Sequence, residues 1–131
     1  MIKEVGFFKK RKILKEMNYL ELTPVRRFEY EIAEDGLVNI LIPKFKNKFL
    51  NKFIPTNKPA DIRIKLDELG SFVFQQIDEQ KKVHEISELL SEKTRDTIQS
   101  SYERTTKFLT LLYSNQYISF KEILINDGSP S

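Results

Sequence analysis

The segment LDELGSFVFQQID, residues 66–78, decides the fold that we expect from this sequence. Leu66 ends an alternating run of apolar and charged residues, which is typical of a strand, and Asp67 is a residue type that caps the start of helices. A short apolar helix should therefore begin directly after the strand and end near Asp78. A polar break over 78–82 separates it from a second helix, whose apolar side chains recur at helical spacing: Val83, Ile86, Leu89 and Leu90.

Three strands are predicted upstream of the first helix. Residues 26–32 alternate apolar and charged side chains, Gly36 suits the positive φ of a tight turn, and residues 37–42 form a second apolar run. These features predict a β-hairpin over 26–43. Residues 61–66 alternate again and predict a third strand, so the three strands should form a small antiparallel sheet.

A third helix and a last short strand are predicted downstream. Ser100 and Glu103 have the spacing of a capping box, and the helix that follows should run to about Asn115. Residues 117–120 have the composition of a short strand. The predicted fold class is α+β, with a three-stranded antiparallel sheet followed by three helices in a winged helix-turn-helix-like arrangement.

The chain of 131 residues suggests a single domain. We expect a basic amino-terminal arm or helix over 1–22, the domain itself over 23–121 with an insert at 44–60, and a tail over 122–131. The arm either binds a membrane surface or partner, or lies on the domain. In the insert, lysines alternate with phenylalanines, a pattern that suits either single-stranded nucleic acid or a connection that tucks its aromatic rings onto the core.

Composition and charge limit the possible functions. The chain has no cysteine, which excludes disulfides and thiolate chemistry, and no apolar run approaches the roughly 20 residues that span a bilayer. With no secretory signal at the start, we expect a cytoplasmic location. Residues 1–60 carry 13 basic against 7 acidic side chains, whereas residues 61–131 carry 9 against 12. The positive charge of the first half suits either a bound polyanion or lysines that keep strand edges soluble, and the second interpretation is favoured because no arginine cluster accompanies the lysines.

The sequence contains no recognisable arrangement of catalytic, metal-binding or phosphate-binding residues. His84 is the single histidine, no histidine or cysteine has metal-ligand spacing, and the glycines do not form a phosphate-binding loop. The carboxylate pairs Asp67/Glu68 and Asp78/Glu79 stand at helix ends, where capping explains them. We therefore expect a protein that is not an enzyme and uses no metal or cofactor.

The second half of the chain resembles the coenzyme PQQ synthesis protein D (PqqD) family. The residues that carry the resemblance are Leu66-Asp67, Gly70, Val73-Phe74, Ile77-Asp78 and Glu85-Ile86, followed by Phe108-Leu109, Leu112 and Tyr117-Ile118. It covers residues 26–120 and is best after residue 61. This chain departs from the family at Glu79, where a glycine is usual, at Lys82, where a threonine is frequent, and in its longer insert and its own arm, so it resembles a divergent member.

The resemblance implies a peptide chaperone. Such domains capture the leader of a ribosomally synthesised precursor peptide and present it to a modifying enzyme, commonly a radical S-adenosylmethionine protein. The leader is added as a strand beside the third strand and packs into a groove against the third helix. The identity of the peptide and its enzyme does not follow from the resemblance.

The candidate peptide-binding residues follow from that implied mechanism. An open strand edge offers main-chain donors and acceptors to an added strand. Arg63 and Lys65 would then attract an acidic leader, or else would prevent unwanted edge pairing. The helix residues that should line the groove are equally plausible as core. The full predicted set is Ile62, Arg63, Ile64, Lys65, Leu66, Tyr102, Thr106, Leu109 and Tyr113.

Two other functions compete with peptide binding. A winged-helix DNA-binding regulator would need a basic recognition helix, and the third helix offers only Arg104 and Lys107 beside Glu103, which makes nucleic acid the less favoured partner. A structural or assembly subunit would use the basic arm over 1–22. A small domain with an open edge can also exchange strands with a second copy, so a homodimer is a further alternative.

Overall fold

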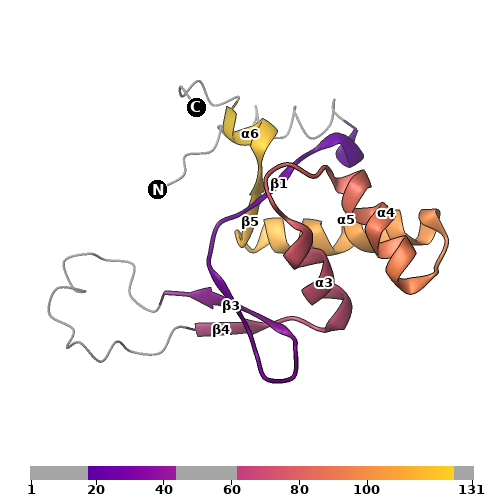
Figure 1. The fold of residues 1–131 in the computed structure, drawn as a ribbon. Coiled ribbons are helices and arrows are strands. Elements are labelled where there is room, and N and C mark those ends of the chain that lie inside the picture. Colours follow the sequence, from indigo (N-terminus) through magenta and orange to yellow (C-terminus); the bar gives the residue numbers. More distant parts are fainter. Residues whose placement is uncertain (1–17, 44–61, 126–131) are drawn as a thin grey trace, which may run out of the picture.

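The computed structural model describes residues 18–43 and 62–125, and these form an α+β fold (Figure 1). The predicted arm, the insert and the end of the tail therefore lie largely outside the described residues. The elements, in chain order, are η1 Tyr19–Glu21, β1 Pro24–Arg26, β2 Tyr30–Ile32, β3 Val38–Ile42, β4 Ile62–Lys65, α3 Glu68–Gln76, α4 Val83–Thr94, α5 Ile98–Ser114, β5 Ile118–Phe120 and α6 Lys121–Ile125.

The strands form two small sheets. The order β2-β3-β4 makes a three-stranded antiparallel sheet, and β1 pairs with β5 in a separate antiparallel ladder. Helices α3, α4 and α5 follow β4 in the chain, and α4 and α5 pack closely together. The predicted fold class, a three-stranded antiparallel sheet followed by three helices, is confirmed.

The predicted hairpin is present, because its turn has the required chemistry. Gly36 has a φ of 84°, its N–H donates to the Ala33 carbonyl at 2.9 Å, and the Ala33 N–H donates to the Leu37 carbonyl at 2.9 Å. A residue with a Cβ is strained at such a positive φ, whereas glycine is not. The turn therefore fixes the register in which Tyr30 faces Ile40.

The first predicted strand, 26–32, is divided between the two sheets. Arg26 ends β1 opposite Ile118, and the Arg27 N–H still donates to the Tyr117 carbonyl at 3.1 Å. The chain then leaves this ladder and joins β3 at Glu29, whose carbonyl accepts from the Leu41 N–H at 2.9 Å. One continuous strand was the wrong interpretation, because the alternation of residue types does not reveal that the pairing partner changes.

Two of the three main helices begin at side-chain caps. The Asp67 carboxylate accepts from the Gly70 N–H at 2.7 Å, as predicted for α3. At α5 the cap is Thr97, whose hydroxyl accepts from the Ser100 N–H at 3.1 Å. The predicted capping box at Ser100 is therefore wrong, and the Ser100 hydroxyl bonds instead to the Asp96 carboxylate at 2.9 Å.

The folded unit extends beyond both predicted boundaries. Leu22, assigned to the arm, is fully buried, and its carbonyl accepts from the Val83 N–H at 2.8 Å. Ile123, assigned to the tail, is also fully buried on α6. Both boundaries are corrected for the same reason, since η1 and α6 are too short to show a helical period in the sequence, yet a core residue directly follows η1 at Leu22 and another lies on α6 at Ile123.

The core lies between the sheets and the helices. Its largest buried side chains include Phe74, Phe120 and Leu109, and Ser71 links the sheet to α3 from within it. The Ser71 hydroxyl accepts from the Val38 N–H at 2.8 Å and donates to the Leu66 carbonyl at 3.4 Å. In the part of the chain that the structure describes, no helix is long and apolar enough to cross a membrane.

Candidate functional site

The first part of the candidate site is the open edge of β4. Among the strands of residues 18–43 and 62–125, β4 pairs with β3 alone, and β4 leads directly into α3 (Figure 1). The Leu66 N–H donates to the Val38 carbonyl at 2.9 Å. Because bonded pairs alternate along an antiparallel ladder, the main-chain groups of Ile64 face β3 and those of Arg63 and Lys65 face outward.

The side chains of Arg63 and Lys65 lie on the outer face of the sheet, where both form ion pairs. Arg63 Nε is 2.9 Å from Glu31 Oε2, and Lys65 Nζ is 2.8 Å from Asp35 Oδ2. The hydrogen bonds from Asn39 and Arg63 lower the pKa of Glu31, and the hydrogen bond from Lys65 lowers that of Asp35. Both cations therefore reach across their own sheet to acidic partners already present in this chain.

The second part of the candidate site is a groove between α3 and α5. The groove has a volume of about 550 Å³ and begins at Asp67, two residues after the end of β4. Its lining is mainly apolar. We call it the α3–α5 groove, and it is lined by Asp67, Leu69, Gly70, Val73, Leu90, Arg104, Lys107, Phe108, Thr110, Leu111 and Ser114.

The close approach of Gly70 to Phe108 shapes this groove. A Cβ atom added at Gly70 would lie 2.9 Å from Phe108 Cζ, closer than real Cβ atoms approach, and 3.0 Å from Phe108 Cε1. Glycine at position 70 therefore lets the Phe108 ring lie directly against α3. Leu111, one turn further along α5, has 59% of its surface exposed at the groove. The groove thus presents apolar surface that the described part of the chain does not cover.

Two basic side chains stand at the α5 side of the groove. Arg104 and Lys107 are both exposed, and Arg104 Nη2 is 3.7 Å from Asp96 Oδ2. Lys107 makes no ion pair with any residue of the described ranges. The groove therefore combines an apolar floor with positive charge along one side.

The predicted site residues are only partly brought together. Those from Ile62 to Leu66 form β4 and its end, as expected, although Leu66 itself is buried. Leu109 is fully buried in the core, and the Tyr113 ring lies 5.3 Å from that of Phe120. The α5 residues that were predicted to line the groove are absent from its lining: Tyr102, Thr106, Leu109 and Tyr113.

The reason is a rotation around α5. A helix turns about 100° per residue, so the stripe of residues 102, 106, 109 and 113 lies about 200° away from the stripe of 104, 108, 111 and 115. From the first stripe, Leu109 enters the core and Tyr113 packs against Phe120, whereas the second contributes Arg104, Phe108 and Leu111 to the groove. The sequence did contain a signal for the groove-facing side of α5, because the basic residues Arg104 and Lys107 stand close to the apolar Phe108.

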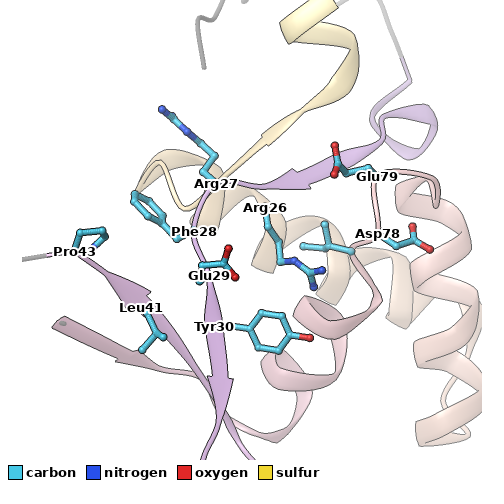
Figure 2. Close-up of a pocket in the computed structure, with 10 residues that line it drawn as sticks. Arg26, Arg27, Phe28, Glu29, Tyr30, Leu41, Pro43, Asp78 and Glu79 are labelled. Carbon is cyan, nitrogen blue, oxygen red and sulfur yellow. The ribbon is translucent and has the colours of Figure 1, made fainter. Parts of the chain in front are cut away.

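A second cavity lies where the chain passes from β1 to β2, and Figure 2 shows ten residues around it. It has a volume of about 610 Å³. The Arg26 guanidinium lies 4.8 Å from the centre of the Tyr30 ring and donates to the Phe74 carbonyl at 3.1 Å, whereas Arg27 points away from that ring (Figure 2). Since Arg26 is already bonded to the end of α3, its evident role is to hold the two sheets and α3 together.

Side chains that could together hold a metal ion do not gather in the described residues. No cluster of three or more histidine, cysteine or carboxylate side chains occurs there. His84 Nδ1 is 3.0 Å from Glu88 Oε2, one turn along the same exposed helix face. That His84 takes part in no reaction stays a prediction.

No protein-family model matches this chain, and no curated protein matches it. The resemblance to the PqqD family therefore rests on the quoted residues and stays a prediction.

Proposed function

We propose that this protein binds an extended peptide by adding it as a strand to β4. The observation that carries the proposal is that the chain passes from the open strand β4 directly to Asp67, two residues later, which lines the apolar α3–α5 groove. Main-chain hydrogen bonds from Arg63 and Lys65 would hold the peptide backbone. Alternate peptide side chains would enter the groove, since successive side chains of a strand point to opposite faces.

The resemblance extends the proposal to a biological role. In that role the peptide is the leader of a ribosomally synthesised precursor, and this protein presents it to a modifying enzyme such as a radical S-adenosylmethionine protein. The conformation of Glu79 supports the resemblance, because its φ of 64° favours glycine, the residue that the family usually has there. In the proposed role the protein binds a peptide and catalyses no reaction, and it acts in the cytoplasm.

The test is an isotope-labelled NMR titration of the full chain with short peptides encoded beside its gene, and with duplex DNA as a control. Strand addition predicts shifts at Arg63, Lys65 and the groove residues of α5. A response to DNA alone, with silence toward every peptide, would favour the winged-helix regulator instead. That response should weaken steeply with salt, because phosphate contacts release counterions.

A proline at position 65 isolates the main-chain contribution. The Lys65 N–H faces the open edge, so Lys65→Pro removes an outward donor while the ladder to β3 keeps its bonds. We expect about a fivefold to tenfold loss of peptide affinity, the worth of one net hydrogen bond. Lys65→Ala is the matched control, because it removes the ion pair to Asp35 but keeps the N–H. Equal affinities of the two variants would contradict strand addition.

Ile64→Pro is a poorer test of the same idea. The Ile64 N–H faces β3 rather than the open edge, so proline at that position breaks the ladder within the sheet. A loss of binding in that variant would not distinguish an altered edge from an unfolded one.

A further inference from the structure

We infer that the α3–α5 groove selects peptides that place an acidic side chain next to apolar anchors, and that Arg104 and Lys107 make this selection. The inference rests on the proposed function and names the class of peptide that the same site takes. It transfers the electrostatic selection from β4, where the sequence suggested it, to α5.

The basic residues of β4 are poor candidates for this selection. Arg63 and Lys65 already form ion pairs at 2.9 and 2.8 Å with Glu31 and Asp35. An acidic peptide near β4 would meet those two carboxylates together with the cations. The local charge on the outer face of the sheet is therefore balanced, and it discriminates little between acidic and basic peptides.

The α5 side of the groove is different. Lys107 has no ionic partner in the described residues, and Arg104 has only a long contact of 3.7 Å to Asp96 with half of its side chain exposed. The one carboxylate in the lining, Asp67, accepts from the Gly70 N–H at 2.7 Å as the cap of α3. A peptide carboxylate in the groove would therefore lie near the positive charges of Arg104 and Lys107, while the negative charge of Asp67 is already engaged by the Gly70 N–H. Complementary charge of this kind favours the matching partner and opposes the like-charged one.

The length of the groove sets the length of the motif. Arg104 and Ser114, its outermost α5 residues, are ten residues apart, which corresponds to about 15 Å along a helix. An extended peptide advances about 3.3 Å per residue, so about five residues span this length. Only alternate side chains face the groove, which leaves room for two or three inward positions. We expect two apolar anchors against Phe108 and Leu111, and one aspartate or glutamate that reaches Lys107 or Arg104.

The experiment is selection of a displayed random dodecapeptide library on the full-length protein. Wild-type protein should enrich alternating apolar residues with an adjacent aspartate or glutamate. Lys107→Glu should lose the acidic preference and enrich lysine or arginine instead. The peptide that wild type selects best should bind Lys107→Glu about fivefold to tenfold more weakly, because an attractive pair becomes a repulsive one.

Lys121→Glu is the matched control, since it changes the net charge equally at α6, away from the groove (Figure 1). Its affinity should stay within about twofold of wild type, because charges beyond a Debye length are screened. Equal losses in both variants would mean non-specific attraction and would overturn the inference. Selected peptides without acidic enrichment that still need the Lys65 N–H would overturn it too, but would leave strand addition standing. A library that yields no binder would count against the proposed function itself.

Discussion

The two flanks of α5 differ in what covers them. On one flank, Leu109 is fully buried, and Tyr113 packs against Phe120 with ring centres 5.3 Å apart. On the other flank, Leu111 has 59% of its surface exposed beside Phe108. One helix thus serves the fold on one side and offers apolar surface on the other.

This difference separates residues that stabilise the protein from residues that are available to a partner. The covered flank is buried mainly against α4, with smaller contacts from β5 and from η1, which come from opposite ends of the described chain. On the open flank, α3 approaches α5 at Gly70 and Phe108, and Leu111 stays mostly exposed. Substitutions on the covered flank should therefore lower stability, whereas substitutions on the open flank should weaken peptide binding and leave stability nearly unchanged.

The largest expected effect distinguishes two leucines of α5. Leu109→Ala should lower the free energy of unfolding by about 2–5 kcal/mol, because it leaves a cavity in the core. Leu111→Ala should change it by less than about 0.5 kcal/mol, because this side chain is mostly exposed, yet should weaken peptide binding. Urea denaturation and the peptide titration measure the two properties. Similar destabilisation by both variants would break the comparison of the flanks.

Two buried serines should differ by the next largest amount. Ser71→Ala leaves the Val38 N–H without its acceptor and should cost about 1–3 kcal/mol. Ser101 is equally buried on the core side of α5, but its hydroxyl has no hydrogen-bond partner in the described structure. Ser101→Ala should therefore be neutral or slightly stabilising in the same denaturation measurement. A cost at Ser101 as large as at Ser71 would contradict this assignment.

A methyl group at Gly70 should alter the open flank directly. Gly70→Ala places a Cβ 2.9 Å from Phe108 Cζ, and overpacking of this kind costs about 1–3 kcal/mol. The Phe108 ring has to move, so peptide affinity should also fall. Gly36→Ala is the control, because its added Cβ meets nothing within 4 Å and only its φ of 84° opposes it. It should destabilise by about 1 kcal/mol, the cost of the left-handed conformation, and leave affinity unchanged.

The smallest expected effect concerns alkaline pH at the contact between η1 and α5, at the border of the two flanks. Burial raises the pKa of Tyr19 above 10, although the hydrogen bond from Thr110 opposes this shift. A raised pKa in the folded state means that the stabilisation is complete below pH 10 and is lost as the pH rises through the folded value. Tyr19→Phe should cost about 0.5–1.5 kcal/mol at neutral pH and should flatten this alkaline decline. A decline as steep as that of wild type would place its origin elsewhere.

The sequence predicted the elements whose signals are local. The turn at Gly36, the alternation over residues 62–66 and the cap at Asp67 each depend on a few neighbouring residues, and all three are present. The open edge of β4 also followed, because the order of the strands places the third strand outermost.

The features that could not be predicted from the sequence depend on contacts between residues that are distant in the chain. Residues 108 to 113 are apolar at five of six positions, so periodicity alone did not show which flank of α5 would be covered. Contacts with residues outside α5 decide which flank is covered. Tyr19, 91 residues before Thr110 in the chain, and Phe120, just after α5, both pack there. The pairing of Arg63 with Glu31 likewise required the register of three strands, and the division of residues 26–32 required β5.

The pairing of β1 with β5 also decides how this fold connects to other polypeptide. The Lys121 N–H donates to the Thr23 carbonyl at 2.8 Å, and Glu122 accepts from both the N–H and the hydroxyl of Thr23. The chain thus enters and leaves the sheets at a single point, while β4 lies toward the opposite end of the molecule (Figure 1). Domains with adjacent ends tolerate insertion and circular permutation. This one should work as a portable unit that can be spliced into a surface loop of a host protein with its groove still facing outward.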